Sequence, residues 1–254
     1  MGKTLLLCDS TCDLSVEQEQ KFGLRVIDCG VELGGLPYRE RSEIDSAKIY
    51  ASVEKTGVLP HHSQITVIEF LEEFARAARD GYTDLLCVTM NAAGSGTHSA
   101  ALHAVGLLPV EYPAAAGLRI RVIDTRTYSL PIAAGLLRAA EQLKKGAGPD
   151  EVGDWLEDFY RSQITLVGLY SLEYAKKSGR LGACAAIVGE ALGIKPIMAI
   201  TGENRVIDKT RGDKNLIPKL VQLYLKLAED PENGDYIVAY GSNPEQAKQL
   251  IAAL

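Results

Sequence analysis

The sequence has no long run of basic residues and no long run of apolar residues. Its 254 residues carry a formal net charge of −6, which gives little electrostatic support for nucleic-acid binding. The longest apolar stretches, such as residues 194–200, are far shorter than the roughly 20 residues of a transmembrane helix. The apolar run after Lys3 is also too short for the core of a signal peptide. We therefore expect a cytoplasmic protein with no nucleic-acid partner and no membrane span.

Cysteine is sparse and scattered along the chain. The five cysteines are Cys8, Cys12, Cys29, Cys87 and Cys184. An odd, dispersed set in a cytosolic protein is typical of reduced, buried thiols. Only three residues separate Cys8 from Cys12, but no second ligand pair follows them, so we predict no metal site.

Common catalytic and nucleotide-binding motifs are missing as well. No Gly-x-Gly-x-x-Gly follows the first predicted strand, which disfavours a dinucleotide cofactor. The order Gly94-Ser95-Gly96 differs from the Gly-x-Ser-x-Gly turn of esterases, and no lysine follows these glycines as in a phosphate-binding Walker loop. The sequence therefore predicts no catalytic residues and no cofactor.

Predicted strands alternate with predicted helices up to residue 161, which is typical of a parallel α/β sheet. We expect strands at residues 3–9, 24–33, 84–90 and 118–124, and helices at 46–55, from 66, up to 104, at 130–144 and at 151–160. Thr66 and Glu69 fit a capping box at the start of one helix, whose buried face would carry Phe70, Phe74 and Ala77. Residues 1–161 are thus predicted to form an N-terminal α/β domain.

The pattern changes in residues 162–254. Strands are expected at 164–170, 195–200, 205–209 and 236–240, two short helices follow the first of these strands, and longer helices are expected at 215–228 and from 244. A hairpin turn at residues 202–204 joins two of the strands. A hairpin next to helical crossovers predicts a smaller C-terminal α/β domain with a mixed sheet.

Three polar segments are candidates for a ligand site, because ligands of open parallel sheets bind beyond the carboxyl ends of the strands. They are residues 9–11, residues 62–66, which we expect to lie in a loop, and residues 91–97. In the third segment, glycines allow close backbone approach, and the following helix start favours an anion. Ser95 and Thr97 add hydroxyl donors, so a carboxylate or phosphate would fit. The alternative is that Ser95 or Thr97 only caps the helix.

Two further groups have more than one interpretation. The pair His61-His62 next to Ser63 suggests acid–base chemistry, but adjacent histidines in a loop are more often exposed and inert. Lys176, Lys177 and Arg180 suggest a corner for a binding partner, or simply a solvated helix end favoured by the helix dipole.

Several segments match a known family in the same order, namely residues 9–15, 31–38, 62–66, 95–100, 122–125, 171–181 and 209–211. With these segments the chain resembles, along essentially its whole length, the DegV family of bacterial fatty-acid-binding proteins, in which Thr-Ser-Gln-Pro-Ser stands at the place of His-Ser-Gln-Ile-Thr at 62–66. The resemblance implies a two-domain α/β protein that binds a long-chain fatty acid in a cleft between its domains. It also implies that the protein is not an enzyme. Some family members present the carboxylate to a separate fatty acid kinase, which makes such a kinase a candidate partner.

The resemblance also predicts the ligand-binding residues. The carboxylate is expected near Ser95 and His62 first, and near Ser63, Asn91 and Gly96 second.

The chain departs from the family pattern at three places. His62 replaces a threonine, Asn91 and Ala92 replace two serines, and Gly94 replaces a leucine. The family's His-x-Gly-Pro-Gly segment near the C-terminus is absent, so we interpret the C-terminal domain as truncated or diverged.

Two other functions remain open. One is an enzyme for a small carboxylated or phosphorylated metabolite, with His62 as the acid–base group. The other is a protein that only binds a partner through its Lys176 corner.

Overall fold

The computed structural model describes residues 2–173, 177, 193–241 and 243–254. The chain divides into two compact units, Met1–Gln163 and Ile164–Leu254. Each unit is built around its own sheet, and the first unit also carries a second, small sheet. In the described residues, no helix is both long enough and apolar enough to cross a membrane.

The first unit is built on a parallel sheet of four strands, in the order β2-β1-β6-β7. The strands are β1 (Thr4–Asp9), β2 (Arg25–Ile27), β6 (Asp84–Thr89) and β7 (Arg119–Asp124). β1 and β6 are buried along nearly their whole length, because helices cover both faces of the sheet. This confirms the parallel α/β fold expected from the sequence.

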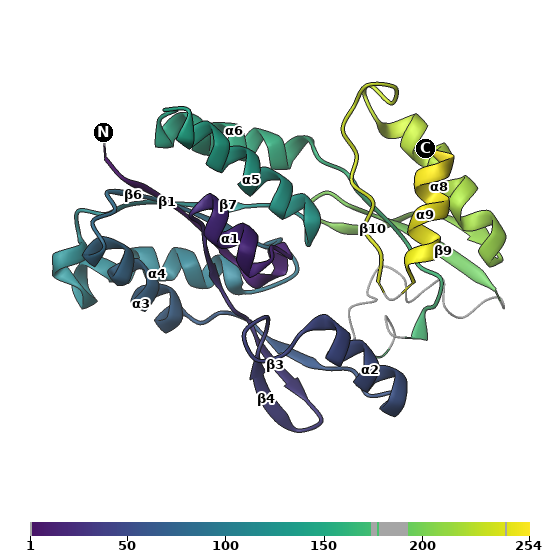
Figure 1. Ribbon diagram of the computed structural model, residues 1–254, viewed down its shortest axis with the longest axis horizontal. Coiled ribbons are helices and arrows are strands. Elements are labelled where there is room, and N and C mark those ends of the chain that lie inside the picture. The colour runs from purple at the N-terminus through teal and green to yellow at the C-terminus, as the bar shows by residue number, and fades with distance from the viewer. Residues whose placement is uncertain (1, 174–176, 178–192, 242) are drawn as a thin grey trace. The chain divides into compact units, whose positions relative to one another are not determined.

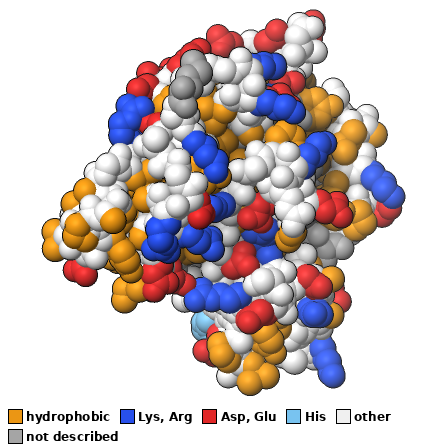
Figure 2. All heavy atoms as spheres, turned by 60° about the vertical axis from the view of Figure 1, so that its left-hand side comes forward, with side chains coloured by type: hydrophobic (Ala, Val, Ile, Leu, Met, Phe, Trp, Pro, Cys, Tyr) orange, Lys and Arg blue, Asp and Glu red, His pale blue; other side chains and the backbone are white. Residues whose placement is uncertain are grey.

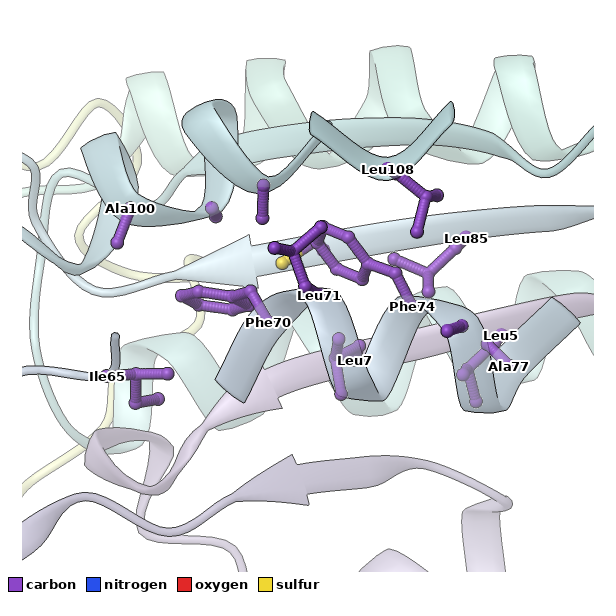
Figure 3. Packing of buried hydrophobic residues seen from close by; sticks show 14 of the residues in the cluster. Leu5, Leu7, Ile65, Phe70, Leu71, Phe74, Ala77, Leu85, Ala100 and Leu108 are labelled. Carbon is purple, nitrogen blue, oxygen red and sulfur yellow. The ribbon is translucent and has the colours of Figure 1, made fainter. Parts of the chain in front are cut away.

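Helices α3 (Val67–Arg79) and α4 (Thr97–Glu111) pack on one face of this sheet, with the short 3-10 helix η2 (Pro113–Ala115) after them. Figure 3 shows Phe70 and Phe74 of α3 lying between the two helices and the strand residues Leu7 and Leu85. The predicted capping box is confirmed, since the Thr66 hydroxyl accepts from the Glu69 amide and the Glu69 carboxylate accepts from the Thr66 amide.

Helices α5 (Leu130–Lys144) and α6 (Pro149–Ser162) lie on the other face of the sheet (Figure 1). Tyr160 of α6 is fully buried, and its hydroxyl donates to the Ile132 carbonyl at 2.9 Å. Helix α1 (Val16–Phe22), which was not predicted, contacts α5. Its start, Ser15 with Gln18, is a capping box.

A small antiparallel sheet in the order β4-β3-β5 extends the first unit, together with helix α2 (Ser46–Thr56). Its strands are β3 (Gly30–Leu33), β4 (Leu36–Arg39) and β5 (His61–Ser63). Two predictions are wrong here. Residues 24–33 form two strands in different sheets, and residues 61–63 form a strand where a loop was expected. β5 exists because it pairs with β3, with His62 opposite Val31.

The second unit has an antiparallel sheet in the order β10-β9-β8, in place of the mixed sheet that we expected. The strands are β8 (Thr165–Gly168), β9 (Ile194–Ile200) and β10 (Asn204–Arg211). Helix α8 (Leu216–Leu227) follows the short 3-10 helix η3 (Asp213–Asn215) and packs Leu216 and Leu223 near Ile197. The mixed sheet was expected from a hairpin next to helical crossovers, one of which led to a strand at residues 236–240. That segment, which precedes α9 (Pro244–Ala253), forms no strand, so the described sheet has no parallel pair.

Charged side chains of both signs are interspersed over the face shown in Figure 2. Ion pairs are frequent among the described residues, for example Arg39 with Glu69 at 2.6 Å and Arg41 with Glu19 at 2.6 Å. That face therefore carries no extended patch of one charge, as the composition predicts.

Candidate functional site

The candidate site lies within the first unit, where the segments after β1, β6 and β7 meet at the carboxyl edge of the parallel sheet. The segment after β1 is the short 3-10 helix η1 (Ser10–Cys12). Asp9 joins it to the segment after β6, because its carboxylate accepts from the Met90 amide at 2.7 Å and from the Thr11 amide at 3.1 Å. Asp9 is only 2% exposed, and this burial raises the pKa of its carboxyl despite the hydrogen bonds.

The segment after β7 is tied to residues 91–97 in the same way. Asp124 accepts from the Ala92 amide at 3.0 Å, and the Asn91 amide donates to the Thr127 carbonyl at 3.0 Å. The Thr125 amide donates to the Thr89 carbonyl at 3.1 Å. Three strand ends that are far apart in the sequence thus form one hydrogen-bonded edge.

Asn91, a predicted ligand-binding residue, is fully buried at this edge. Its side-chain amide donates to the Tyr128 hydroxyl at 3.1 Å, and its side-chain carbonyl accepts from the Ala93 amide at 3.1 Å. Its backbone carbonyl accepts from the Gly94 amide at 3.0 Å. Asn91 therefore shapes the turn that leads to Ser95.

Ser95 lies at the start of α4 and is half-buried. Its hydroxyl is 3.0 Å from the Thr97 hydroxyl and accepts from the Thr97 amide at 3.2 Å. Ser95 therefore does make a capping contact with the start of α4, as the alternative interpretation predicts, through the Thr97 amide. Gly96 is the capping residue of α4 itself and offers no side chain, so the amides of the first turn that follow Thr97 have no side-chain cap and favour an anion at this helix start.

Gln64 contacts the same edge, and its neighbour Ser63 packs on β3. A Cβ atom at Gly30 would lie 2.2 Å from the Ser63 hydroxyl. This hydroxyl therefore packs directly against the backbone of β3 at Gly30. A Cβ atom at Gly96 would lie 2.1 Å from the side-chain carbonyl of Gln64. Gln64 therefore packs directly on Gly96, which joins the segment after β5 to the segment before α4.

The Ser10 hydroxyl anchors the small sheet to this edge. It donates to the Glu40 carboxylate at 2.6 Å and accepts from the Cys29 amide at 3.0 Å. Glu40 follows β4 and Cys29 precedes β3, so the sheet that carries His62 and Ser63 is tied to the segment after β1.

His62 is placed differently from Ser63. Alternation along β5 puts its side chain on the face opposite to that of His61 and Ser63. His62 is exposed, and within the described part of the chain its imidazole has no hydrogen-bond or ion-pair partner. An acid–base histidine usually has a group that fixes its orientation. This arrangement gives the enzyme alternative no support.

The cysteines that the structure describes are buried and form no disulfide. The sulfur atoms of Cys8 and Cys12 are 3.5 Å apart. Burial raises the pKa of the Cys29 thiol to about 12, which keeps it protonated at neutral pH. In the described ranges, no three side chains of the metal-binding types lie close enough to hold an ion. Cys184 lies outside the described residues.

The predicted Lys176 corner also falls largely outside the described residues, since neither Lys176 nor Arg180 is described. Lys177 pairs with Glu173 at 2.8 Å, four residues earlier.

Sequence reasoning missed Tyr128 as a member of this edge, and it included Gln64 only as part of the polar segment 62–66, without a role of its own. Both pack on glycines of the segment 91–97, and this signal is visible only once the backbone is known.

A family model described as "Uncharacterised protein, DegV family" matches residues 3–254. A DegV domain-containing protein of Clostridium perfringens is 27% identical over 98% of this chain and 87% of its own length. The structure of a DegV family protein from Thermus thermophilus, described by its fatty acid binding, superposes with a TM-score of 0.76 at 28% identity. This match covers 89% of the present chain and 78% of the Thermus thermophilus chain.

A fatty-acid-binding protein from Eubacterium ventriosum, described with stearic acid, has the same fold, with a TM-score of 0.86 at 24% identity. That match covers 100% of this chain and 86% of the other. The two-unit α/β chain with this polar edge thus has the fold of lipid-binding proteins in the solved structures. The chain belongs to the DegV family.

Proposed function

We propose that this protein binds a long-chain fatty acid and holds its carboxylate at the edge formed by residues 62–64 and 91–97. The observation that carries the proposal is the packing of Gln64 on Gly96, which joins two hydroxyl-bearing segments at one helix start. The family membership supports the acyl ligand, since the related Thermus thermophilus protein is described by its fatty acid binding.

Ser95 is the first carboxylate contact in this proposal. Its hydroxyl can rotate toward a ligand, and the backbone amide of Gly96 lies next to it. The N-terminus of α4 favours a negative charge at this place. Ser63 contributes a second hydroxyl and His62 an imidazole. Since β5 presents these two side chains on opposite faces, we expect Ser63 to contribute more than His62.

The energetics of such binding are favourable. Burial of an acyl chain contributes roughly 0.8 kcal/mol for each CH₂ group. About fifteen methylenes supply on the order of 12 kcal/mol before the entropic costs of association. The carboxylate needs only enough hydrogen bonds to offset the cost of leaving water.

We further propose that the protein acts as a non-catalytic carrier in the cytoplasm and presents the bound carboxylate to a fatty acid kinase. A purified fatty acid kinase should form acyl phosphate faster when the loaded protein, rather than free fatty acid, is supplied. Equal rates from both sources would remove the kinase from the proposal and leave the binding function.

The binding function is tested by lipid extraction of the purified protein with mass spectrometry, followed by titration of the delipidated protein with a C16 or C18 fatty acid. Ser95→Ala should weaken binding by about 1.5–3 kcal/mol, the value of one hydrogen bond to a charged group. Ser46→Ala is the control, because Ser46 is an exposed serine at the start of α2. A protein that carries no lipid and takes up none on titration would disprove the proposal.

A further inference from the structure

Tyr128 and Gly94 form a close contact at the candidate site. A Cβ atom at Gly94 would lie 1.9 Å from the Tyr128 hydroxyl oxygen and 2.9 Å from the ring carbon that bears it. The φ angle of Gly94 lies outside the positive region, so its backbone conformation does not demand glycine. Glycine is required here for lack of space, because the Tyr128 phenol occupies the volume that a side chain at position 94 would need.

The same hydroxyl holds Asn91. It accepts from the Asn91 side-chain amide at 3.1 Å, while Asn91 itself binds the amides of Ala93 and Gly94. Tyr128 therefore meets the turn 91–94 twice, once by a hydrogen bond at its beginning and once by packing at its end. Ser95 follows directly.

The segment that carries Tyr128 is itself firmly held. Thr125 and Thr127 on its amino side are buried, and the Thr127 carbonyl accepts the Asn91 amide at 3.0 Å. On its carboxyl side the Ser129 amide donates to the Thr11 carbonyl at 2.9 Å. Arg126 and Ser129 have φ angles of 58° and 67°, which are costly for residues with a side chain and persist only where the surroundings fix them. The backbone on both sides of Tyr128 is therefore held in place, and it fixes the position from which the Tyr128 side chain extends.

We propose that Tyr128 and Asn91 are positioning residues that fix the turn 91–94 and so aim the Ser95 hydroxyl and the first amides of α4 at the carboxylate. The carboxylate part of this inference rests on the proposed function. Asn91 then supports the turn and does not contact the ligand, since it is fully buried and its side-chain NH₂ group donates to Tyr128.

Binding measurements with two ligands separate positioning from general stability. Tyr128→Phe removes the acceptor for Asn91 and keeps the ring, and Gly94→Ala displaces the ring. For both variants we expect a loss of about tenfold in affinity for palmitic acid, the size of one ordinary hydrogen bond. The methyl ester of the same acid carries no charge to be held, so its affinity should change less than twofold.

Tyr112→Phe is the matched control, because Tyr112 packs against the core beside α3 and α4, and its change should alter neither affinity. Equal losses for acid and ester would show a merely structural role and overturn the inference. Unchanged acid binding in Tyr128→Phe and Gly94→Ala would overturn it as well.

Hydrogen exchange in the ligand-free protein tests the positioning independently of the fatty acid. The amides of Ala93 and Gly94 are bound to Asn91, so they should exchange several-fold faster in Tyr128→Phe than in the unaltered protein. Unchanged exchange at both amides overturns the inference. Faster exchange in a protein that binds no fatty acid would keep the positioning role and reject the proposed function.

Discussion

In the first unit, strands β1 and β6 are buried along almost their whole length, whereas in the second unit β10 has side chains that alternate between half-buried and exposed. Two large apolar clusters fill both faces of the parallel sheet. Among the described residues of the second unit, the buried cluster consists of Ile197, Leu216 and Leu223. The first unit thus has a large core behind its polar edge, whereas the edge strand β10 of the second unit has one exposed face.

The largest expected effect comes from the core of the first unit. Phe74 is fully buried between α3 and the sheet, so Phe74→Ala should lower the free energy of unfolding by about 3–5 kcal/mol. Urea denaturation followed by the fluorescence of the single tryptophan, Trp155 in α6, measures this unit. Ile68→Ala on the exposed side of the same helix should change stability by less than about 0.5 kcal/mol.

A smaller effect is expected in the second unit. Leu223 of α8 is 7% exposed and belongs to the smaller cluster, so Leu223→Ala should cost about 2 kcal/mol. Since Trp155 belongs to the first unit, this loss should appear in circular dichroism more than in tryptophan fluorescence. A shift of both signals by the same amount would mean that the two units unfold as one.

The smallest effect concerns the start of α3. Partial burial opposes ionisation of Glu69, but hydrogen bonds from Thr66 and Arg39 outweigh it and lower the pKa of Glu69. Because the folded pKa is lowered, the stabilisation is present above the ordinary value of 4.5 and is lost as pH falls through the folded pKa. Glu69→Gln should cost about 1 kcal/mol at pH 7.

The pH dependence gives the check on that assignment. The difference in unfolding free energy between Glu69→Gln and the unaltered protein should shrink as the pH is lowered below 4.5. A difference that stays constant down to pH 3 would show that the charge of Glu69 does not contribute.

Local signals predicted much of the first unit, because β1 and β6 are apolar runs and α3 begins with a capping box. The capping box at Thr66 and the buried face with Phe70 and Phe74 are confirmed. Helix α1 was missed although Ser15 and Gln18 carry the same signal. β5 was missed because its residues, His61–Ser63, become a strand only by pairing with β3.

The reverse error occurred at residues 236–240. Tyr236, Ile237 and Tyr240 favour a strand by composition, yet the segment has no pairing partner in the described structure, and these side chains are about half exposed. Strand formation depends on a neighbour that local sequence does not specify. For the site, the sequence pointed to Ser95, Asn91 and the segment 62–66, but Tyr128 and the packing of Gln64 on Gly96 emerge only from contacts with glycine backbones.

The contact between Tyr128 and Gly94 also has an evolutionary consequence. Two positions 34 residues apart share one volume, so the effect of a substitution at either depends on the residue at the other. A leucine at position 94, as in the family pattern, requires that the Tyr128 ring moves away or that position 128 becomes smaller. Epistasis of this kind restricts the order in which substitutions can accumulate. We expect positions 94 and 128 to change together among related sequences.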